Sequence, residues 1–201
     1  MSGKGKSLRD RRRAETRRMI QAHAIRLFVE VGYDETAVND VAEAAGVSAM
    51  TVYRHFATKE DLVLYDEYDP LTAAAILARP GDEPLVRRIG RALVDTAAAA
   101  DVSGDPAAKA LLLDRLRLMI STPALRARHL DSQYATQSAI VDALCGPAGD
   151  PELEFSVRAA SGAVLGAVHV ALTRWAEHDG RDDLPGLMRE SLNRAFGISF
   201  G

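Results

Sequence analysis

The sequence predicts an all-α protein, with a three-helix helix-turn-helix domain at the N-terminus and a larger helical domain behind it. Apolar residues recur at helical spacing through most of the chain. Strand-like alternation is scarce, and aromatic residues make up only 5% of the sequence. Gly and Pro breaks divide the chain into helix-sized segments, which we expect to form about nine helices. With 201 residues, the chain suits one larger domain or two small ones that share a core.

The first domain, residues 1–60, should contain three helices. The first is expected at about residues 10–31, with Gly32 as its end. The apolar face of this helix should be formed by Ile20, Ala24, Leu27, Phe28 and Val31. Two short helices are expected to follow, near residues 38–45 and 49–56.

The second domain, residues 61–201, should begin with one long helix over residues 59–78. Thr58 is expected to cap it, with Asp61 three residues later as the partner in a capping box. The remaining helices are expected near residues 84–100, 106–121, 123–145, 151–178 and 184–196. Asp105-Pro106 and Asp150-Pro151 each place a proline at a first helical position behind an acidic cap.

Charge is distributed unevenly between the two domains. Residues 1–18 contain eight Lys or Arg against two acids, a net charge of +6, whereas residues 61–201 carry a net charge of −6. A basic end on an acidic body concentrates any attraction for phosphate near the N-terminus. On charge alone, a solvated tail that only aids solubility explains the pattern equally well.

The segment from Val38 to Phe56 has the packing pattern of a helix-turn-helix. Gly46 stands where the chain must turn sharply, and Ser48 is placed to cap the second short helix. The positions expected to be buried at this corner are Val41, Ala45, Val47, Val52 and Phe56.

The second short helix must present its other side chains to solvent, and these are Met50, Thr51, Tyr53 and Arg54. An Arg can donate two hydrogen bonds to guanine, a Thr can contact a base edge or a thymine methyl, and a Tyr can reach a phosphate. This face therefore suits a DNA major groove. The alternative is an αα-corner inside a helical protein that has no role in DNA binding.

Residues 17–62 resemble the N-terminal DNA-binding domain of TetR-family regulators. The matching pieces are Ala24-x-x-Leu27-Phe28, Gly32-Tyr33-x-x-Thr36, Val41-Ala42-x-x-Ala45-Gly46-Val47-Ser48, Thr51-Val52-Tyr53-x-His55-Phe56 and Lys59-x-x-Leu62. The resemblance implies that the helix near residues 49–56 lies in the major groove. It also implies that the chain is a DNA-binding regulator with a ligand-binding and dimerisation domain behind the helix-turn-helix.

The same resemblance implies which side chains meet DNA. Contacts to phosphate are expected from Thr36, Ser48, Tyr53, His55 and Lys59. Contacts to base edges are expected from Met50, Thr51 and Arg54. The minor groove is expected to be reached by Arg11, Arg12 and Arg13. Packing beside Phe56 is the alternative role for His55, and for Tyr33 we favour packing against the first helix.

Helix 151–178 is the predicted dimer interface, because small residues recur along it at steps of three and four and allow a second helix to approach closely. In the TetR family the last two helices pair with their symmetry mates as a four-helix bundle. The residues expected at the interface are Gly162, Leu165, Gly166, His169, Leu172, Leu187 and Leu192. The alternative is a central helix buried within one subunit, in which His169 is a hydrogen-bonded core residue.

The segment from Asp114 to Arg128 resembles a subgroup of the family whose rear domain binds acyl-CoA-like ligands. It implies an effector with a long apolar body and an anionic head. The apolar channel is expected to be lined by Leu116, Met119, Ile120, Tyr134 and Phe155, with Arg115 or Arg117 near its mouth. The alternative is that these are ordinary core residues and solvated arginines.

The sequence therefore predicts a cytoplasmic homodimer that binds double-stranded DNA and is a repressor released by a small-molecule effector. A non-specific or architectural DNA-binding protein is the first alternative, and an enzyme is the second. Because no H-x-x-x-H or H-E-x-x-H pair, phosphate-binding loop or G-x-S-x-G motif is present, we expect no catalysis, cofactor or metal site. The single cysteine, Cys145, lies outside any metal-ligand spacing, and we expect that no apolar run approaches the roughly 20 residues that span a bilayer.

The expected mechanism depends on the long helix over residues 59–78. An effector bound among helices 84–145 should swing this helix, which begins at the DNA-reading domain. The swing would change the separation of the two recognition helices of the dimer, which must match one turn of DNA, about 34 Å.

Overall fold

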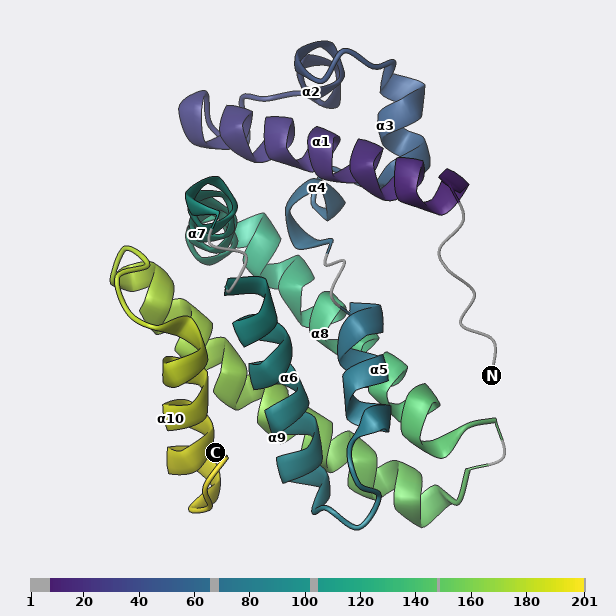
Figure 1. Ribbon diagram of the computed structural model, residues 1–201. Helices are drawn as coiled ribbons and strands as arrows, with labels where there is room; N and C mark the ends of the chain where they lie inside the picture. Colours follow the sequence, from purple (N-terminus) through teal and green to yellow (C-terminus); the bar gives the residue numbers. More distant parts are fainter. Residues whose placement is uncertain (1–7, 66–68, 102–104, 148, 201) are drawn as a thin grey trace.

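The computed structural model describes residues 8–65, 69–101, 105–147 and 149–200, and in these ranges the regular structure is helical throughout (Figure 1). Ten helices lie in the described ranges, where about nine were expected. The prediction of an all-α protein is confirmed.

The three N-terminal helices, which we call the head, form a small bundle. In Figure 1, α1 (Leu8–Glu30) runs across the molecule below α2 (Val38–Ala44) and α3 (Ala49–His55). Tyr33 packs edge-on against Phe28 with ring centroids 5.0 Å apart, which confirms the packing role expected for it. Val31 does not join the apolar face, because α1 ends before it and its side chain is exposed.

The predicted long helix over residues 59–78 is wrong, because two helices occupy that stretch. α4 (Asp61–Leu64) ends at Tyr65, whose backbone is extended with ψ at 124°, and α5 runs from Asp69 to Ala78. Pro70, the second residue of α5, explains part of the break: a proline is tolerated in the first turn of a helix but not in its interior.

The predicted helix caps are confirmed where the structure describes them. Thr58 and Asp61 form the reciprocal capping pair: the Asp61 carboxylate accepts from the Thr58 amide at 3.0 Å, and the Thr58 hydroxyl accepts from the Asp61 amide at 3.2 Å. The side chains of Asp105 and Asp150 likewise accept from backbone amides at the starts of their helices.

The rear helices, α5 to α10, form the larger part of the molecule, which we call the body. Its remaining elements are α6 (Leu85–Asp101), α7 (Pro106–Ser121), α8 (Pro123–Cys145), α9 (Pro151–Glu177) and α10 (Leu184–Phe196). α9 packs on α6, α7, α8 and α10, so it is the central helix of the body. Trp175, near the end of α9, is almost fully buried and donates its indole N–H to the Asp182 carbonyl at 2.9 Å.

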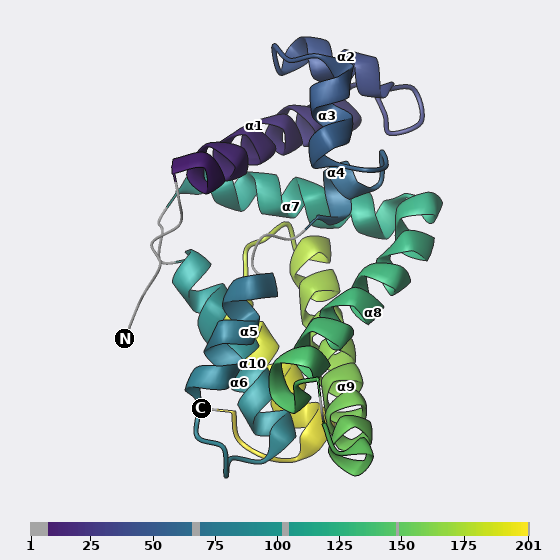
Figure 2. The ribbon, with the colours of Figure 1, turned by 90° about the vertical axis from the view of Figure 1, so that its right-hand side faces the viewer.

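α7 lies between the head and the rest of the body. Figures 1 and 2 show it below α1 and beside α4, with α5, α6, α9 and α10 further down. α7 packs against α1 and α4 on one side and against α8 and α9 on the other. Any displacement of α7 therefore acts on both parts of the molecule.

The C-terminal residues fold back on α6. The Phe200 ring is buried beside Gly90 of α6, where a Cβ atom would lie only 2.5 Å from a ring carbon. The Phe200 carbonyl accepts from Arg91 Nε at 3.2 Å, and its amide donates to Asn193 Oδ1 at 2.9 Å. Gly90 thus allows the tail to clamp α6 against α10.

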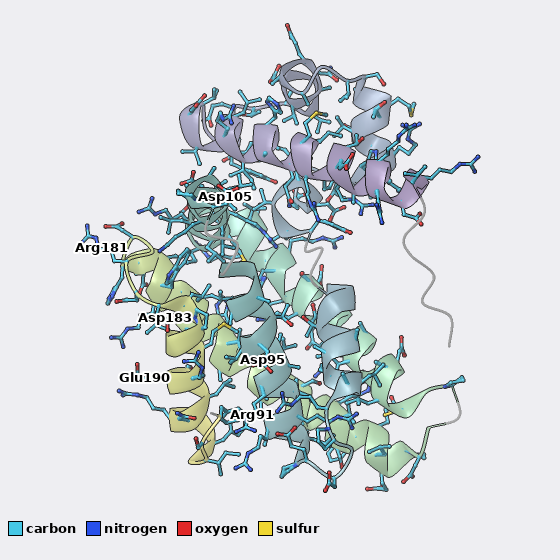
Figure 3. The ribbon with its side chains drawn as sticks, in the orientation of Figure 1. Arg91, Asp95, Asp105, Arg181, Asp183 and Glu190 are labelled. Carbon is cyan, nitrogen blue, oxygen red and sulfur yellow. The ribbon has the colours of Figure 1, made fainter. Side chains whose placement is uncertain are left out.

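Charged side chains lie on the outside of the body, and Figure 3 labels six of them. Arg91 on α6 belongs to a small network in which Glu83 also pairs with Arg79, at 2.8 Å, and Arg79 pairs with Asp95, at 3.0 Å. These ion pairs join the segment after α5 to α6. Asp95 is 66% exposed, so its pair with Arg79 contributes little to stability, whereas the Arg79–Glu83 pair is more shielded from solvent.

α9 has a length and composition that would allow it to cross a membrane, so the expectation that no segment approaches this limit is wrong. About a third of its most apolar window is buried inside this subunit (33%). A core helix of a soluble protein meets the same criteria of length and composition. The inner face of α9 packs in the core of this subunit.

Candidate nucleic-acid interface

The turn between α2 and α3 has the geometry of a helix-turn-helix. Gly46 adopts φ of 64°, in the left-handed region that favours glycine, and the Val47 amide donates to the Ala42 carbonyl at 2.9 Å. Ser48 caps α3 by accepting from the Thr51 amide at 3.2 Å. The positions predicted to close this corner are buried or half-buried: Val41, Ala45, Val47, Val52 and Phe56.

The outward face of α3 is presented to solvent as predicted. Met50 is 76% exposed and Tyr53 is 51% exposed, and Arg54 lies beside them on the surface. Thr51 is half-buried, and its hydroxyl lies 3.0 Å from the Ser48 hydroxyl. The face therefore offers one cation, one phenol and one apolar side chain to a groove.

A cluster of basic side chains adjoins α3. Burial lowers the pKa of His55, and the nearby positive charges of Arg17, Arg13 and Arg54 lower it further. His55 therefore stays neutral near pH 7, and the surrounding arginines supply the positive charge. Such a cluster next to an exposed recognition helix suits a phosphate backbone.

Two residues predicted to contact phosphate donate hydrogen bonds to backbone carbonyls of the loop after α1. Thr36 is buried, and its hydroxyl donates to the Gly32 carbonyl at 2.7 Å, so its side chain holds the loop after α1. Lys59 is half-buried, its ammonium donates to the Tyr33 carbonyl, and it lies 4.3 Å from the centre of the Tyr33 ring. The partner of Thr36 lies four residues back in the chain and that of Lys59 lies 26 residues back, and a match to the motif does not reveal either hydrogen bond.

The three arginines assigned to the minor groove belong to a helix. Arg11, Arg12 and Arg13 lie on the first turns of α1 and are exposed. They are therefore held by a helix that points past α3, whereas residues 1–7 of the basic segment lie outside the described residues.

The residues expected to line an effector channel do not all lie together. Leu116 and Met119 are buried in the core, and Ile120 packs against it. Tyr134 and Phe155 are on the outer surface of the body, 68% and 71% exposed, so they do not line an internal channel here. The sequence pattern could not show that these two side chains face outward, because a helix with apolar residues on more than one side does not reveal which side faces the core.

The two arginines expected at the channel mouth have other partners. Arg115 donates from Nε to the Val63 carbonyl at 2.7 Å and from Nη2 to the Leu64 carbonyl at 3.3 Å. Arg117 pairs with Asp179, in the turn after α9. Arg115 therefore faces α4, not a channel mouth.

The residues predicted at the dimer interface divide into two groups. Gly162 and Gly166 are exposed on the outer side of α9, with Leu165, His169, Leu172 and Leu187 half-buried. Leu192 is fully buried within the subunit against the C-terminal tail, so it offers no surface to a partner. His169 lies 3.2 Å from His129 of α8, between ring nitrogens, in a stacked pair that joins these two helices.

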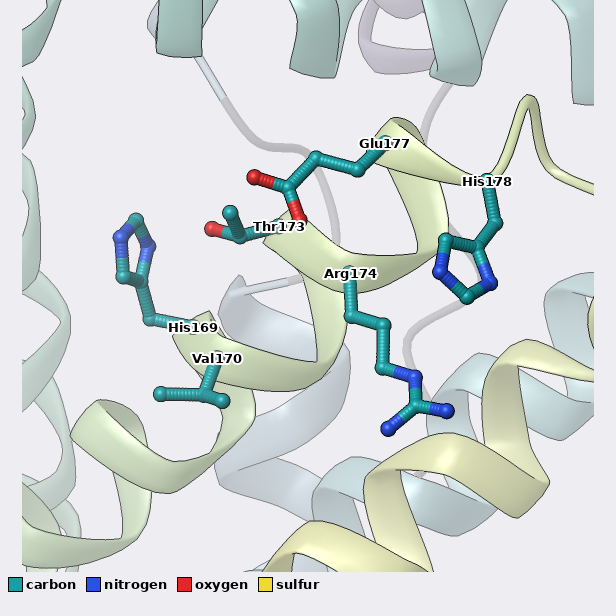
Figure 4. Close-up of a pocket in the computed structure, with 6 residues that line it drawn as sticks. All are labelled: His169, Val170, Thr173, Arg174, Glu177 and His178. Atoms are coloured by element: carbon teal, nitrogen blue, oxygen red, sulfur yellow. The ribbon is translucent and has the colours of Figure 1, made fainter.

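Two surface hollows lie on the body. One, of about 470 Å³, lies along the end of α9 and is lined by the six residues that Figure 4 shows: His169, Val170, Thr173, Arg174, Glu177 and His178. The other, of about 250 Å³, lies between α4 and α8 beside Leu64, Tyr65 and Arg128. Within the described residues, no group of three or more metal-ligating side chains occurs.

Two protein-family models match the chain. Residues 20–65 match the model of bacterial regulatory proteins of the tetR family, and residues 83–196 match the model of the MftR C-terminal domain. The second match alone covers more than half of the chain. The chain belongs to the TetR family.

Two TetR-family relatives differ in how much of the chain they match. The chain is 35% identical over 131 residues to the HTH-type transcriptional regulator TcmR of Streptomyces glaucescens, a match that covers 63% of this chain and 57% of TcmR. It is 27% identical over 188 residues to MftR of Mycobacterium tuberculosis, named for regulation of mycofactocin biosynthesis, and this match covers 94% and 91% of the two chains.

Among solved structures, the chain is similar in fold to the transcriptional regulator FadR of Bacillus subtilis in complex with stearoyl-CoA. That chain superposes with a TM-score of 0.56 at 19% identity, covering 90% of this chain and 98% of FadR. At this identity the likeness establishes the fold.

Three TetR-domain residues that the prediction missed lie where α1 meets the end of α4. Tyr65 accepts from Arg17 Nη1 at its hydroxyl, at 2.6 Å, and from Gln21 Nε2 at its carbonyl, at 3.1 Å. The Arg17 guanidinium also lies over the Tyr65 ring, 4.4 Å from its centre. No local signal marks these contacts, since more than forty residues separate the partners.

Proposed function

We propose that this TetR-family chain is a sequence-specific transcriptional repressor that binds a palindromic operator as a homodimer and leaves it when an acyl-type effector binds. The observation that carries the DNA-binding part is the exposed face of α3, where Met50, Tyr53 and Arg54 point outward beside a basic cluster. This face fits a major groove, and the charges beside it fit the phosphates that flank the groove. A cytoplasmic location is part of the same proposal.

A homodimer is supported by the outer side of α9. Gly162, Gly166 and Val170 are exposed there, and a Cβ added to Gly166 would meet nothing within 4 Å in the subunit. Small residues on an exposed apolar helix face favour close packing with a second helix. Two heads are also needed to read enough base pairs for a single genomic site.

An acyl-type effector is supported by two similarities. The MftR C-terminal domain model matches most of the body, and the FadR structure with the same fold holds stearoyl-CoA. Leu116 and Met119 of α7 already occupy the core, so a long apolar chain would have to enter by separating α7 from its neighbours. That displacement is the step by which binding would reach the head.

Mobility shift with the DNA upstream of the chain's own gene tests the DNA-binding proposal. We expect one preferred palindromic site and a steep loss of affinity as salt rises, because phosphate contacts release counterions. Equal affinity for unrelated duplexes of the same length would instead favour a non-specific architectural protein.

Adding stearoyl-CoA to the preformed complex tests the effector, with coenzyme A lacking an acyl chain as the matched control. Release by the acyl compound alone supports the proposal, and mass spectrometry of the denatured protein should then detect a bound acyl compound. An unchanged shift at saturating stearoyl-CoA would exclude this effector class while leaving the DNA-binding result intact.

A further inference from the structure

The head and the body are joined by α4, a helix of only four residues. Its core residues Leu62 and Val63 are fully buried, and Leu64 is nearly so. Because Tyr65 is extended, α4 does not continue into α5 as one rigid rod. The position of the head therefore depends on side-chain contacts that hold α4.

Arg115 holds α4 from the body. Its two hydrogen bonds, at 2.7 and 3.3 Å, reach the carbonyls of Val63 and Leu64, which lie in the last turn of α4. Carbonyls in a last turn lack helical partners, and the negative end of the helix dipole favours a cation there. A guanidinium can satisfy both carbonyls at once because its donors form a planar fork.

Tyr65 holds α4 to the head. Arg17 and Gln21, one helical turn apart on α1, donate to its hydroxyl and its carbonyl at 2.6 and 3.1 Å. The other side of the contact is apolar: the Tyr65 ring packs edge-on against Phe56, just after α3, with centroids 6.0 Å apart. Tyr65 thus contacts both the helix that carries the basic cluster and the end of the recognition helix.

We propose that Arg115 and Tyr65 are positioning residues that transmit a movement of α7 to the DNA-reading head. Arg115 is next to Leu116 on α7, and Met119 lies one turn further, so whatever displaces these two core side chains also displaces the guanidinium. The carbonyls of Val63 and Leu64 follow it, and Tyr65 carries the displacement to α1 and Phe56. The role of this coupling in releasing DNA when an effector binds rests on the proposed function, but the coupling between α7 and the head does not.

A distance measurement within one subunit tests the link without DNA or effector. Nitroxide labels would be placed by Glu43→Cys on α2 and Ser138→Cys on α8, two exposed positions, in a Cys145→Ser background. Diluting labelled protein with unlabelled protein makes pairs of labelled subunits rare, so pulsed EPR then measures distances within one subunit. We expect Arg115→Gln to broaden the distance distribution at least twofold, because the two hydrogen bonds that tie α7 to the last turn of α4 are lost.

Three further variants separate this role from general stability. Arg117→Gln alters an exposed arginine two residues away on α7 that pairs with Asp179, so it should leave the distribution unchanged. Arg115→Lys keeps a cation near the two carbonyls and should restore part of the narrow distribution. Tyr65→Phe removes only the hydroxyl that accepts from Arg17 and should broaden the distribution with the ring packing retained.

The overturning result is a distribution that is the same in Arg115→Gln, Tyr65→Phe and Arg117→Gln, with all three folded by circular dichroism. In the same variants, the affinity for the upstream DNA with and without stearoyl-CoA gives the functional readout. We expect the ratio of the two affinities to fall towards one in Arg115→Gln and to stay at the wild-type value in Arg117→Gln. If the wild type shows no response to stearoyl-CoA, the effector proposal fails while the distance measurement still decides the link.

Discussion

Arg54 stands on the exposed face of α3, beside Tyr53 and near His55, and no intramolecular ion pair of this residue is among those the structure describes. Its position contrasts with that of Thr36 and Lys59, which matched the family pattern equally well but make contacts inside the head. The motif predicted that these residues matter to the head. The motif lists the residue types but not the hydrogen bonds that hold Thr36 and Lys59 to the backbone carbonyls of Gly32 and Tyr33.

Replacing Arg54 with alanine should weaken binding to the preferred operator about tenfold to a hundredfold, because one bidentate contact to a base is lost. Fluorescence anisotropy with labelled operator at fixed salt measures the change. Arg181→Ala, which removes an arginine that is 81% exposed in the turn after α9, is the matched control and should bind like the wild type. Equal affinities for both variants would remove Arg54 from the interface.

The half-buried His129 side chain predicts a dependence of stability on pH. Burial lowers its pKa to about 4, with further lowering by His169 and Arg115. The unfolded chain takes up a proton as the pH falls through about 6.5, whereas the folded chain resists it until about pH 4. The free energy of unfolding should therefore decrease as the pH is lowered from about 6.5 to about 4.

Urea titrations at pH 7 and pH 5 measure this effect, which should be at most about 2 kcal/mol for this residue. His129→Gln should make the two titrations more alike, and at pH 8 its difference from the wild type reports only the lost packing. An unchanged pH dependence in the variant would assign the effect to other groups.

At the scale of single helices, the ends were predictable where the signal is local. Asp105-Pro106 and Asp150-Pro151 marked starts that the structure confirms, since a cap and a proline act within one turn. The same pair occurs at Asp69-Pro70, where α5 begins, yet the apolar periodicity across it favoured one long helix. Tertiary contacts to Tyr65 stabilise the break, and these come from residues far away in the chain.

The contact between Gly90 of α6 and Phe200 of the C-terminal tail also depends on residues far apart in the chain, so the sequence around Gly90 does not reveal it. Gly90→Ala should destabilise the protein by about 1–3 kcal/mol, since the new methyl overlaps the Phe200 ring. In a Phe200→Ala background the same change should be nearly neutral, or slightly stabilising through helix propensity. Chemical denaturation of the four proteins gives the coupling energy. Equal effects in both backgrounds would contradict the proposed overlap.

For the whole molecule, the outer side of α9 is the surface that we propose for the dimer interface. Gly166→Arg should yield a folded monomer, because the subunit has room for a side chain there but a partner helix would not. Light scattering after size exclusion measures the mass, and operator affinity should fall with it. Ala108→Arg, at an exposed position on α7, is the control and should remain dimeric. A dimeric Gly166→Arg variant would place the interface elsewhere.

The short α4 also bears on how such proteins diversify. The head meets the body through α4, its two carbonyls and the packing of α1 on α7, so we expect an exchange of heads between relatives to change operator choice without redesign of the body. The body then supplies the donor at position 115 and the aromatic hydroxyl at position 65, so the exchange should succeed only when the incoming head keeps donors at positions 17 and 21. Chimaeras joined inside α4 should therefore inherit regulation from the donor of α7, whichever parent supplies the recognition helix.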